Sequence, residues 1–292
     1  MNYVGKMWRP PSEAKSLILQ TTVGCSHNNC TFCIMYKEKD FYIKSMEEIK
    51  QEIEEASQAY PGMRRVFLAD GDALKIPTED LLTIMGWLDE AFPRLTRVTT
   101  YASPQSIQEK TVEELRELNQ AGLKMAYLGL ESGSAKFLKE FDKWVTLEMM
   151  VDAGQKLKKA GIKASVTMIL GLGGEKLSDE HARETAKVVN RMEPRFLSAL
   201  TLMVDERAPL YQRIDQGEFR LLNPYQAIQE LYTLIKHIDV EEPCIFRSNH
   251  ASNYIAANGT LPKDKEDMLS DLKDVLDNPE KYHLKQEYLR SL

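Results

Sequence analysis

Three cysteines, Cys25, Cys30 and Cys33, stand in one short stretch with the spacing C-x4-C-x2-C. They follow directly on the apolar run 16–22. A cubane iron–sulfur cluster takes four ligands, so a loop with three thiolates leaves one iron open to a cofactor or a substrate. The spacing therefore predicts that these three residues jointly hold one [4Fe–4S] cluster, and that Cys244, far along the chain, is not a ligand.

Two other uses of these cysteines need weighing. Cys25, His27, Cys30 and Cys33 could form a zinc site, although the usual spaced pairs of zinc ligands are absent. A disulfide framework is disfavoured because the chain is long, has four cysteines and carries no secretory signal. Glycine and asparagine residues in the same stretch favour a loop that wraps around an inorganic core.

Further candidate cofactor-contacting residues stand at the ends of later apolar runs: Asp70, Gly71, Asp72, Ser103, Glu131, Leu170 and Gly171. The two aspartates could accept hydrogen bonds from an ammonium group, and the glycine between them lets the backbone approach a ligand closely. Glu131 ends an otherwise apolar run, where a carboxylate is costly without a partner. We expect these residues to gather at the carboxyl ends of parallel strands.

A dense polar segment follows the apolar run near position 246, and it is the predicted substrate-binding segment: Arg247, Asn249, His250, Ser252 and Asn253. His250 is also a candidate catalytic residue because imidazole exchanges protons near neutral pH. Tyr101, at the end of an earlier run, is the second catalytic candidate. The other histidines of helical segments are expected at the surface: His181, His237 and His283.

The cysteine loop resembles that of the radical S-adenosylmethionine (SAM) superfamily. The usual spacing there is C-x3-C-x2-C, and this chain has one more residue in the first gap. The resemblance covers roughly residues 17–203 and points to the branch that contains the Elongator catalytic subunit and coproporphyrinogen dehydrogenase. It implies that Phe32, just before the third cysteine, borders the adenine of SAM.

The same resemblance implies roles for the strand-end residues. Asp70–Asp72 takes the place of a Gly-Gly-Glu loop that binds the SAM amino group, and Ser103 is placed to reach the same cofactor. Glu131 lies in a Gly-x-Glu-Ser-Gly stretch near the SAM ribose and amino acid moiety, and Lys143 pairs with the SAM carboxylate. The strand ending in Leu170-Gly171 contacts the adenine through its backbone.

The implied chemistry is reductive cleavage of SAM to methionine and a 5′-deoxyadenosyl radical, which abstracts hydrogen from a substrate. Reduced flavodoxin or ferredoxin would supply the electron. The substrate, small molecule or macromolecule, is left open. Two alternatives from other classes are a cluster- or SAM-binding protein of chaperone type, without radical turnover, and a zinc-stabilised barrel.

The elements that must position these residues alternate along the chain. Amphipathic helical segments separate six apolar runs, predicted as parallel strands at 17–22, 65–69, 97–102, 125–130, 164–170 and 196–203. Ser45 and Glu48 form a capping-box pattern, and Gly122 and Gly161 are predicted to end helices. Six units are fewer than the eight of a closed barrel. They match the partial (β/α)6 TIM-like barrel that the resemblance implies.

The predicted radical SAM core covers residues 1–210, and residues 211–292 form a C-terminal helical extension that closes the barrel. The extension is expected to contain helices at 223–238 and 263–277 and a strand at 244–248. A net charge of −6 and a pI of about 5.6 give no general nucleic-acid footprint. No apolar stretch approaches the roughly 20 residues of a membrane span. Without a signal peptide, a cytoplasmic location is expected, where thiols stay reduced.

Overall fold

The computed structural model describes residues 1–291 and divides into two compact units. The first unit comprises Met1–Asn28, Met35–Leu128 and Gln155–Ala164. The second unit comprises Asn29–Ile34, Gly129–Gly154 and Ser165–Leu292. The cysteine loop therefore contributes residues to both units, with Cys25 in the first and Cys30 and Cys33 in the second.

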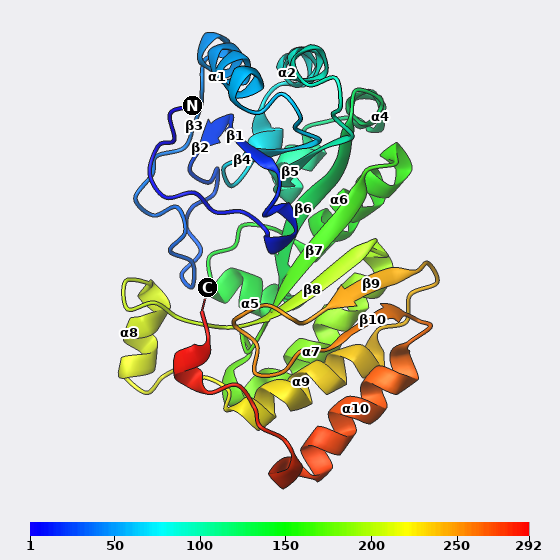
Figure 1. Ribbon diagram of the computed structural model, residues 1–292. Coiled ribbons are helices and arrows are strands. Elements are labelled where there is room, and N and C mark those ends of the chain that lie inside the picture. The colour runs from blue at the N-terminus through cyan, green and yellow to red at the C-terminus, as the bar shows by residue number, and fades with distance from the viewer. Residues whose placement is uncertain (292) are drawn as a thin grey trace. The chain divides into compact units, whose positions relative to one another are not determined.

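Parallel strands form the centre of the first unit, in the order β1 (Leu17–Gln20), β4 (Arg65–Ala69), β5 (Arg97–Ala102) and β6 (Leu123–Glu131). Three helices pack along them, α1 (Met46–Ala59), α2 (Thr78–Ala91) and α4 (Val112–Gln120) (Figure 1). The strands are apolar along most of their length, as expected for parallel strands covered by helices. The short α3 (Pro104–Gln108) follows β5.

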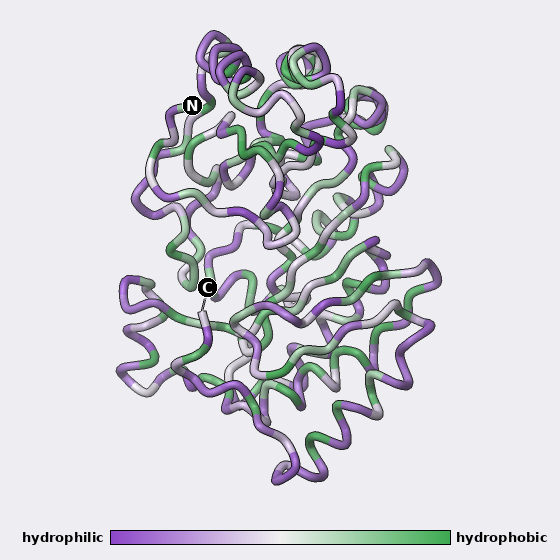
Figure 2. The backbone as a smooth tube through the Cα atoms, in the orientation of Figure 1, coloured by the Kyte–Doolittle hydropathy of each residue, from purple (hydrophilic) through white to green (hydrophobic). Residues whose placement is uncertain are grey.

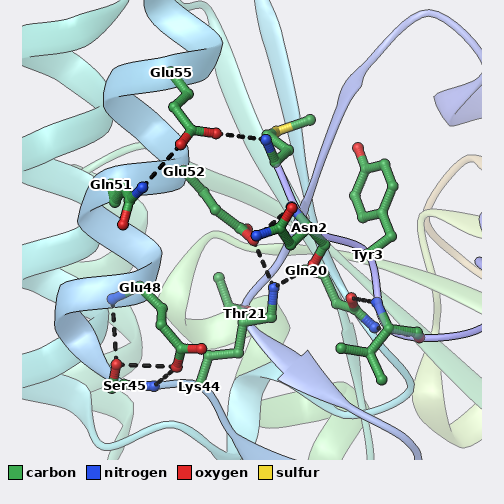
Figure 3. A network of polar contacts seen from close by, with 12 residues as sticks. Asn2, Tyr3, Gln20, Thr21, Lys44, Ser45, Glu48, Gln51, Glu52 and Glu55 are labelled. Carbon is green, nitrogen blue, oxygen red and sulfur yellow. Dashed lines mark hydrogen bonds and ion pairs between the residues drawn. The ribbon is translucent and has the colours of Figure 1, made fainter.

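Strands β2 (Thr22–Val23) and β3 (Tyr42–Ile43) form a small antiparallel pair. Residues 24–41, which connect them, are the cysteine loop. The capping box predicted at the start of α1 is present, because Ser45 and Glu48 each accept from the other's backbone amide. Next to it, the buried Lys44 ammonium lies 2.7 Å from the Glu52 carboxylate and also donates to the Asn2 carbonyl (Figure 3). Through these contacts, Lys44 connects Asn2 near the N-terminus to Glu52 of α1.

The second unit has three parallel strands and one antiparallel strand, in the order β7 (Lys163–Leu170), β8 (Phe196–Thr201), β9 (Cys244–Arg247) and β10 (Asn258–Leu261). Its helices are α5 (Ala135–Glu140), α7 (Gly174–Met192), α8 (Pro209–Asp215), α9 (Pro224–His237) and α10 (Lys265–Asp277). Helix α9 packs between α7 and α10, and α10 alternates hydrophilic and hydrophobic residues as an amphipathic helix does (Figure 2). Helix α6 (Leu147–Ala160) runs from the second unit into the first.

The six predicted strands are confirmed as β1 and β4 to β8, with ends shifted by at most two residues. The expected strand near 244 is β9, and the two expected C-terminal helices are α9 and α10. Gly122 and Gly161 follow helices with φ of 118° and 77°, conformations that favour glycine. The domain boundary near residue 210 stays a prediction. Within residues 1–291, no helix combines the length and apolarity that a membrane span requires.

Candidate functional site

All four cysteines lie in the described part of the chain, and none forms a disulfide. Cys25, Cys30 and Cys33 are half-buried between β2 and β3. Cys244 is fully buried in β9, and burial raises the pKa of its thiol to about 12. A thiol that stays protonated in an apolar strand is a poor metal ligand. That Cys244 is not a cluster ligand stays a prediction.

In the first unit, Asp70 lies completely buried beneath the start of the cysteine loop. Its Oδ2 atom accepts hydrogen bonds from the Gly24 amide at 3.1 Å, from Gln20 Nε2 at 2.9 Å and from Lys39 Nζ at 2.8 Å. Its Oδ1 atom has no partner among the described residues. Asp70 was expected to accept a hydrogen bond from a cofactor ammonium. Its Oδ2 atom instead accepts all three of these hydrogen bonds from groups of the protein.

Asp72 is also fully buried, and its carboxylate accepts four hydrogen bonds. The Ser26 hydroxyl and the Ser103 hydroxyl donate to Oδ2, and the Ser103 amide and the Ser106 hydroxyl donate to Oδ1. Ser103 also caps the N-terminus of α3. The sequence predicted that Asp72 and Ser103 each contact the cofactor. The structure pairs them with each other, and their contact with the cofactor stays a prediction.

Tyr101 at the end of β5 packs edge to face against Phe67, with ring centroids 4.9 Å apart, and against Tyr127. Burial raises the pKa of the Tyr101 phenol far above its ordinary value, with a further contribution from Tyr127. The side chain is therefore a neutral phenol that can donate a hydrogen bond but does not act as a base. Its catalytic role stays a prediction.

In the second unit, the part of the cysteine loop around Phe32 is held by helices α5 and α8. The Thr31 amide donates to the Phe141 carbonyl at 3.1 Å, and the Leu210 amide donates to the Thr31 carbonyl at 3.0 Å. The Phe32 ring lies edge to face with Phe141, at a centroid distance of 5.9 Å, against a buried cluster that includes Phe137. Phe32 is thus fixed in orientation, as an aromatic that borders a cofactor would need to be.

Glu131 and Lys143, both predicted to contact the cofactor, form an ion pair with Lys143 Nζ 3.0 Å from Glu131 Oε1. The side chains are only 16% and 14% exposed. The Glu131 backbone has φ of 60°, an uncommon conformation for a residue with a Cβ. The carboxylate folds back over Gly129, where a Cβ would overlap the Glu131 Oε1 atom. The glycine two residues earlier therefore makes room for it.

The glycine-rich segment after β7 is anchored by Glu230 of α9. Glu230 Oε1 accepts from the Gly171 amide at 2.9 Å, and His181 Nδ1 lies 2.8 Å from the same oxygen. The Ser178 hydroxyl donates to Oε2. His181 is completely buried and so corrects the expectation of a surface histidine. Glu230 was missed, although an acid on the apolar face of the predicted helix 223–238 was a usable signal.

The predicted substrate-binding segment, which begins at the last residue of β9 and leads toward β10, has two kinds of residue. Asn253 is buried, with Nδ2 donating to the Ala199 carbonyl at 2.8 Å and Oδ1 accepting from the Thr201 hydroxyl at 2.8 Å. Its amide binds the segment to β8, and its role in substrate binding stays a prediction. Arg247 and Asn249 are exposed and His250 is half-buried. These three remain substrate-binding candidates.

A metal site of the zinc type needs four ligands at about 2.0–2.3 Å from one ion. Within residues 1–291, no three side chains of the types His, Cys, Asp and Glu converge closely enough to hold a metal ion. A cubane differs, because each thiolate bonds a separate iron and the ligands do not meet at one point. Three cysteines on one loop, none of them in a disulfide, fit such a cluster in type and number.

The model of the radical SAM superfamily matches residues 19–188, which is more than half of the chain. An uncharacterised protein of Methanocaldococcus jannaschii is 25% identical over 228 residues, which cover 74% of this chain and 69% of that protein. Among solved structures, the radical SAM enzyme coproporphyrinogen III oxidase (HemN) from Escherichia coli is 16% identical with a TM-score of 0.57. Elp3 from Methanocaldococcus infernus is 14% identical with a TM-score of 0.53.

The HemN likeness covers 76% of this chain and 51% of HemN, and the Elp3 likeness covers 91% and 63%. The chain thus spans one half to two thirds of these neighbours, which share its fold. The expected α/β class and partial barrel of the radical SAM type are confirmed. Because the superfamily model matches most of the predicted core, this chain belongs to the radical SAM superfamily.

Proposed function

We propose that this protein binds one [4Fe–4S] cluster through Cys25, Cys30 and Cys33, cleaves SAM reductively and uses the resulting radical to abstract hydrogen from a substrate. The observation that carries the proposal is the set of three half-buried cysteines on one loop, none in a disulfide, in a chain of this superfamily. When bound and reduced, the cluster supplies the electron that breaks the sulfonium C–S bond of SAM.

The ion pair of Glu131 and Lys143 supports a binding role toward the amino acid end of SAM. That end carries a carboxylate and an ammonium, so Lys143 matches the first group and Glu131 the second. The two side chains are nearly buried and lie 3.0 Å apart, so each charge already has a partner before SAM arrives. Exchange of partners on binding leaves no charge unpaired, which keeps the desolvation cost low.

Phe32, Leu170 and Gly171 are the proposed neighbours of the adenine. The Phe32 ring is fixed by its contact with Phe141. The Gly171 amide already donates to Glu230, and the Leu170 carbonyl accepts from Leu202. The backbone here therefore offers the adenine an apolar face rather than new hydrogen bonds. Gly171 has φ of 92° and no side chain, which keeps that face flat.

The substrate is proposed to meet Arg247, Asn249 and His250, and Tyr101 is the proposed donor of a proton or hydrogen bond. Burial and the nearby Lys285 ammonium lower the pKa of His250, so the imidazole is neutral at neutral pH. Reduced flavodoxin or ferredoxin is the proposed electron donor. A cytoplasmic location would suit a cluster held by three thiolates.

The test is the iron and sulfide content of anaerobically reconstituted protein. The wild type and Cys244→Ala should each contain about four irons and four sulfides per chain. Cys25→Ala, Cys30→Ala and Cys33→Ala should each lose most of both. Full cluster content in any of the three variants, or loss in Cys244→Ala alone, would refute the assignment of ligands. Stoichiometric zinc without sulfide would favour the zinc-stabilised barrel.

A further inference from the structure

Asp70, Gly71 and Asp72 form a loop after β4, here called the β4 loop. Its two carboxylates accept hydrogen bonds from the residues on both sides of Cys25. Asp70 Oδ2 accepts from the Gly24 amide at 3.1 Å, immediately before the cysteine. Asp72 Oδ2 accepts from the Ser26 hydroxyl, immediately after it. Both carboxylates are fully buried, where hydrogen bonds to a charged group are strong.

Gly71, between the two aspartates, packs directly on Cys25. The Gly71 amide donates to the Gly24 carbonyl at 3.0 Å. A Cβ at this position would lie 3.0 Å from the Cys25 Cβ, 3.2 Å from the Cys25 Cα and 2.8 Å from the ring of Tyr36. There is no room for a side chain, so the absence of one is what allows the β4 loop to approach the cysteine.

Asp70 also secures the far end of the cysteine loop where the chain returns to the first unit. Its Oδ2 atom lies 2.8 Å from Lys39 Nζ, and the side chains of this ion pair are 0% and 6% exposed. Asn28 Nδ2 donates to the Tyr36 carbonyl at 2.7 Å and so draws the two ends of the loop together. Gly24 before the cysteines and Lys39 after them are therefore both bound to the same Asp70 carboxylate.

Asp72 has no acceptor left for a ligand. A carboxylate offers about four lone-pair sites, and four protein donors already occupy those of Asp72. We infer that the β4 loop positions Cys25 as the first cluster ligand, and that Asp72 acts on the cysteine loop and on α3 rather than on the SAM ammonium. The inference rests on the proposed function for the identity of Cys25 as a ligand.

Two uncharged substitutions test whether the β4 loop positions Cys25, without altering the charge near the thiol. Gly71→Ala adds a methyl group against Cys25, and Ser26→Ala removes the hydroxyl that donates to Asp72. Gly86→Ala is the matched control, because a Cβ on Gly86 in α2 meets nothing within 4 Å. The first measurement is the alkylation rate of Cys25 by iodoacetamide in cluster-free protein, followed by peptide mass spectrometry. Cys244 is the internal standard for unfolding, since it is fully buried.

We expect Cys25 alkylation to accelerate by about 5- to 140-fold in Gly71→Ala. In Ser26→Ala, which removes a hydrogen bond to a carboxylate, the expected factor is about 10- to 150-fold. Cys244 should stay unreactive in both variants, and Gly86→Ala should match the wild type. After reconstitution without SAM, Gly71→Ala should shift the midpoint potential or the EPR spectrum of the reduced cluster, while Gly86→Ala should not.

The inference is overturned if Gly71→Ala and Ser26→Ala both leave Cys25 reactivity and the cluster spectrum unchanged. It is also overturned if Gly71→Ala weakens only SAM binding, which would return the β4 loop to the cofactor role expected from the sequence. Should Gly71→Ala fail to fold, Ser26→Ala decides alone. Wild-type protein that binds no cluster would refute the proposed function. The alkylation rates would still test whether the β4 loop positions Cys25.

Discussion

The paired charges of Glu131 and Lys143 are the part of the site where a single residue should matter most for SAM. Each side chain keeps its partner 3.0 Å away in a nearly buried position. Removing one charge breaks this ion pair, and it would also remove the charged hydrogen bond that we propose to the amino acid end of SAM. The cost of such a bond is about 1.5–3 kcal/mol, or roughly 10- to 150-fold in affinity.

Lys143→Ala and Glu131→Gln should therefore weaken SAM binding by about 10- to 150-fold, measured by anaerobic titration calorimetry on reconstituted protein. Glutamine has nearly the same size and shape as glutamate, so Glu131→Gln tests the charge at this position. Lys139→Ala, at an exposed position of α5, is the control and should bind SAM as the wild type does. Unchanged affinity in Lys143→Ala would assign this ion pair to the fold alone.

At the scale of elements, the segment between β9 and β10 depends on a neutral histidine. His250 Nδ1 accepts from the Ser252 amide at 3.1 Å and lies 2.9 Å from the Ser252 hydroxyl. Burial, together with the Lys285 ammonium, lowers the pKa of His250 below the ordinary histidine value of about 6.5. A lowered folded-state pKa gives stability that is present above the unfolded pKa and is lost as the pH falls through the folded pKa.

The stability of wild-type protein relative to His250→Asn should therefore fall between pH 8 and pH 5. The measurement is the difference in thermal unfolding midpoint between the two proteins at each pH. Asn249→Ala changes a neighbour without a titratable group, so its difference from the wild type should be the same at both pH values. A wild-type advantage that stays constant or grows toward pH 5 would mean that His250 is not held in its neutral form.

The sequence predicted the main strands and the outer helices because parallel strands covered by helices are continuous apolar runs. It missed β2, β3 and β10, which have two to four residues and little apolar pattern. Residue types at the strand ends were also predictable. Their partners were not, because the donors to Asp72 come from two segments far away in the chain. Local pattern holds no information on such long-range pairing.

For the whole molecule, superfamily membership sets the expected reaction, and the chain's own residues set how the cofactors would be held. Net charge −6 gives no general attraction to nucleic acid, so a nucleic-acid substrate would need a local basic surface. The two compact units each contribute residues of the cysteine loop. Loss of the cluster that the three thiols are proposed to hold should abolish the reaction as a whole.

The most direct test of this account is the formation of 5′-deoxyadenosine from SAM. Anaerobically reconstituted protein is reduced with dithionite or a flavodoxin-type donor, and the products are quantified by liquid chromatography. The account predicts 5′-deoxyadenosine and methionine in equal amounts from the wild type and from Cys244→Ala, and only background levels from Cys33→Ala. A fully loaded, reduced wild-type protein that binds SAM but forms no more 5′-deoxyadenosine than Cys33→Ala would contradict it.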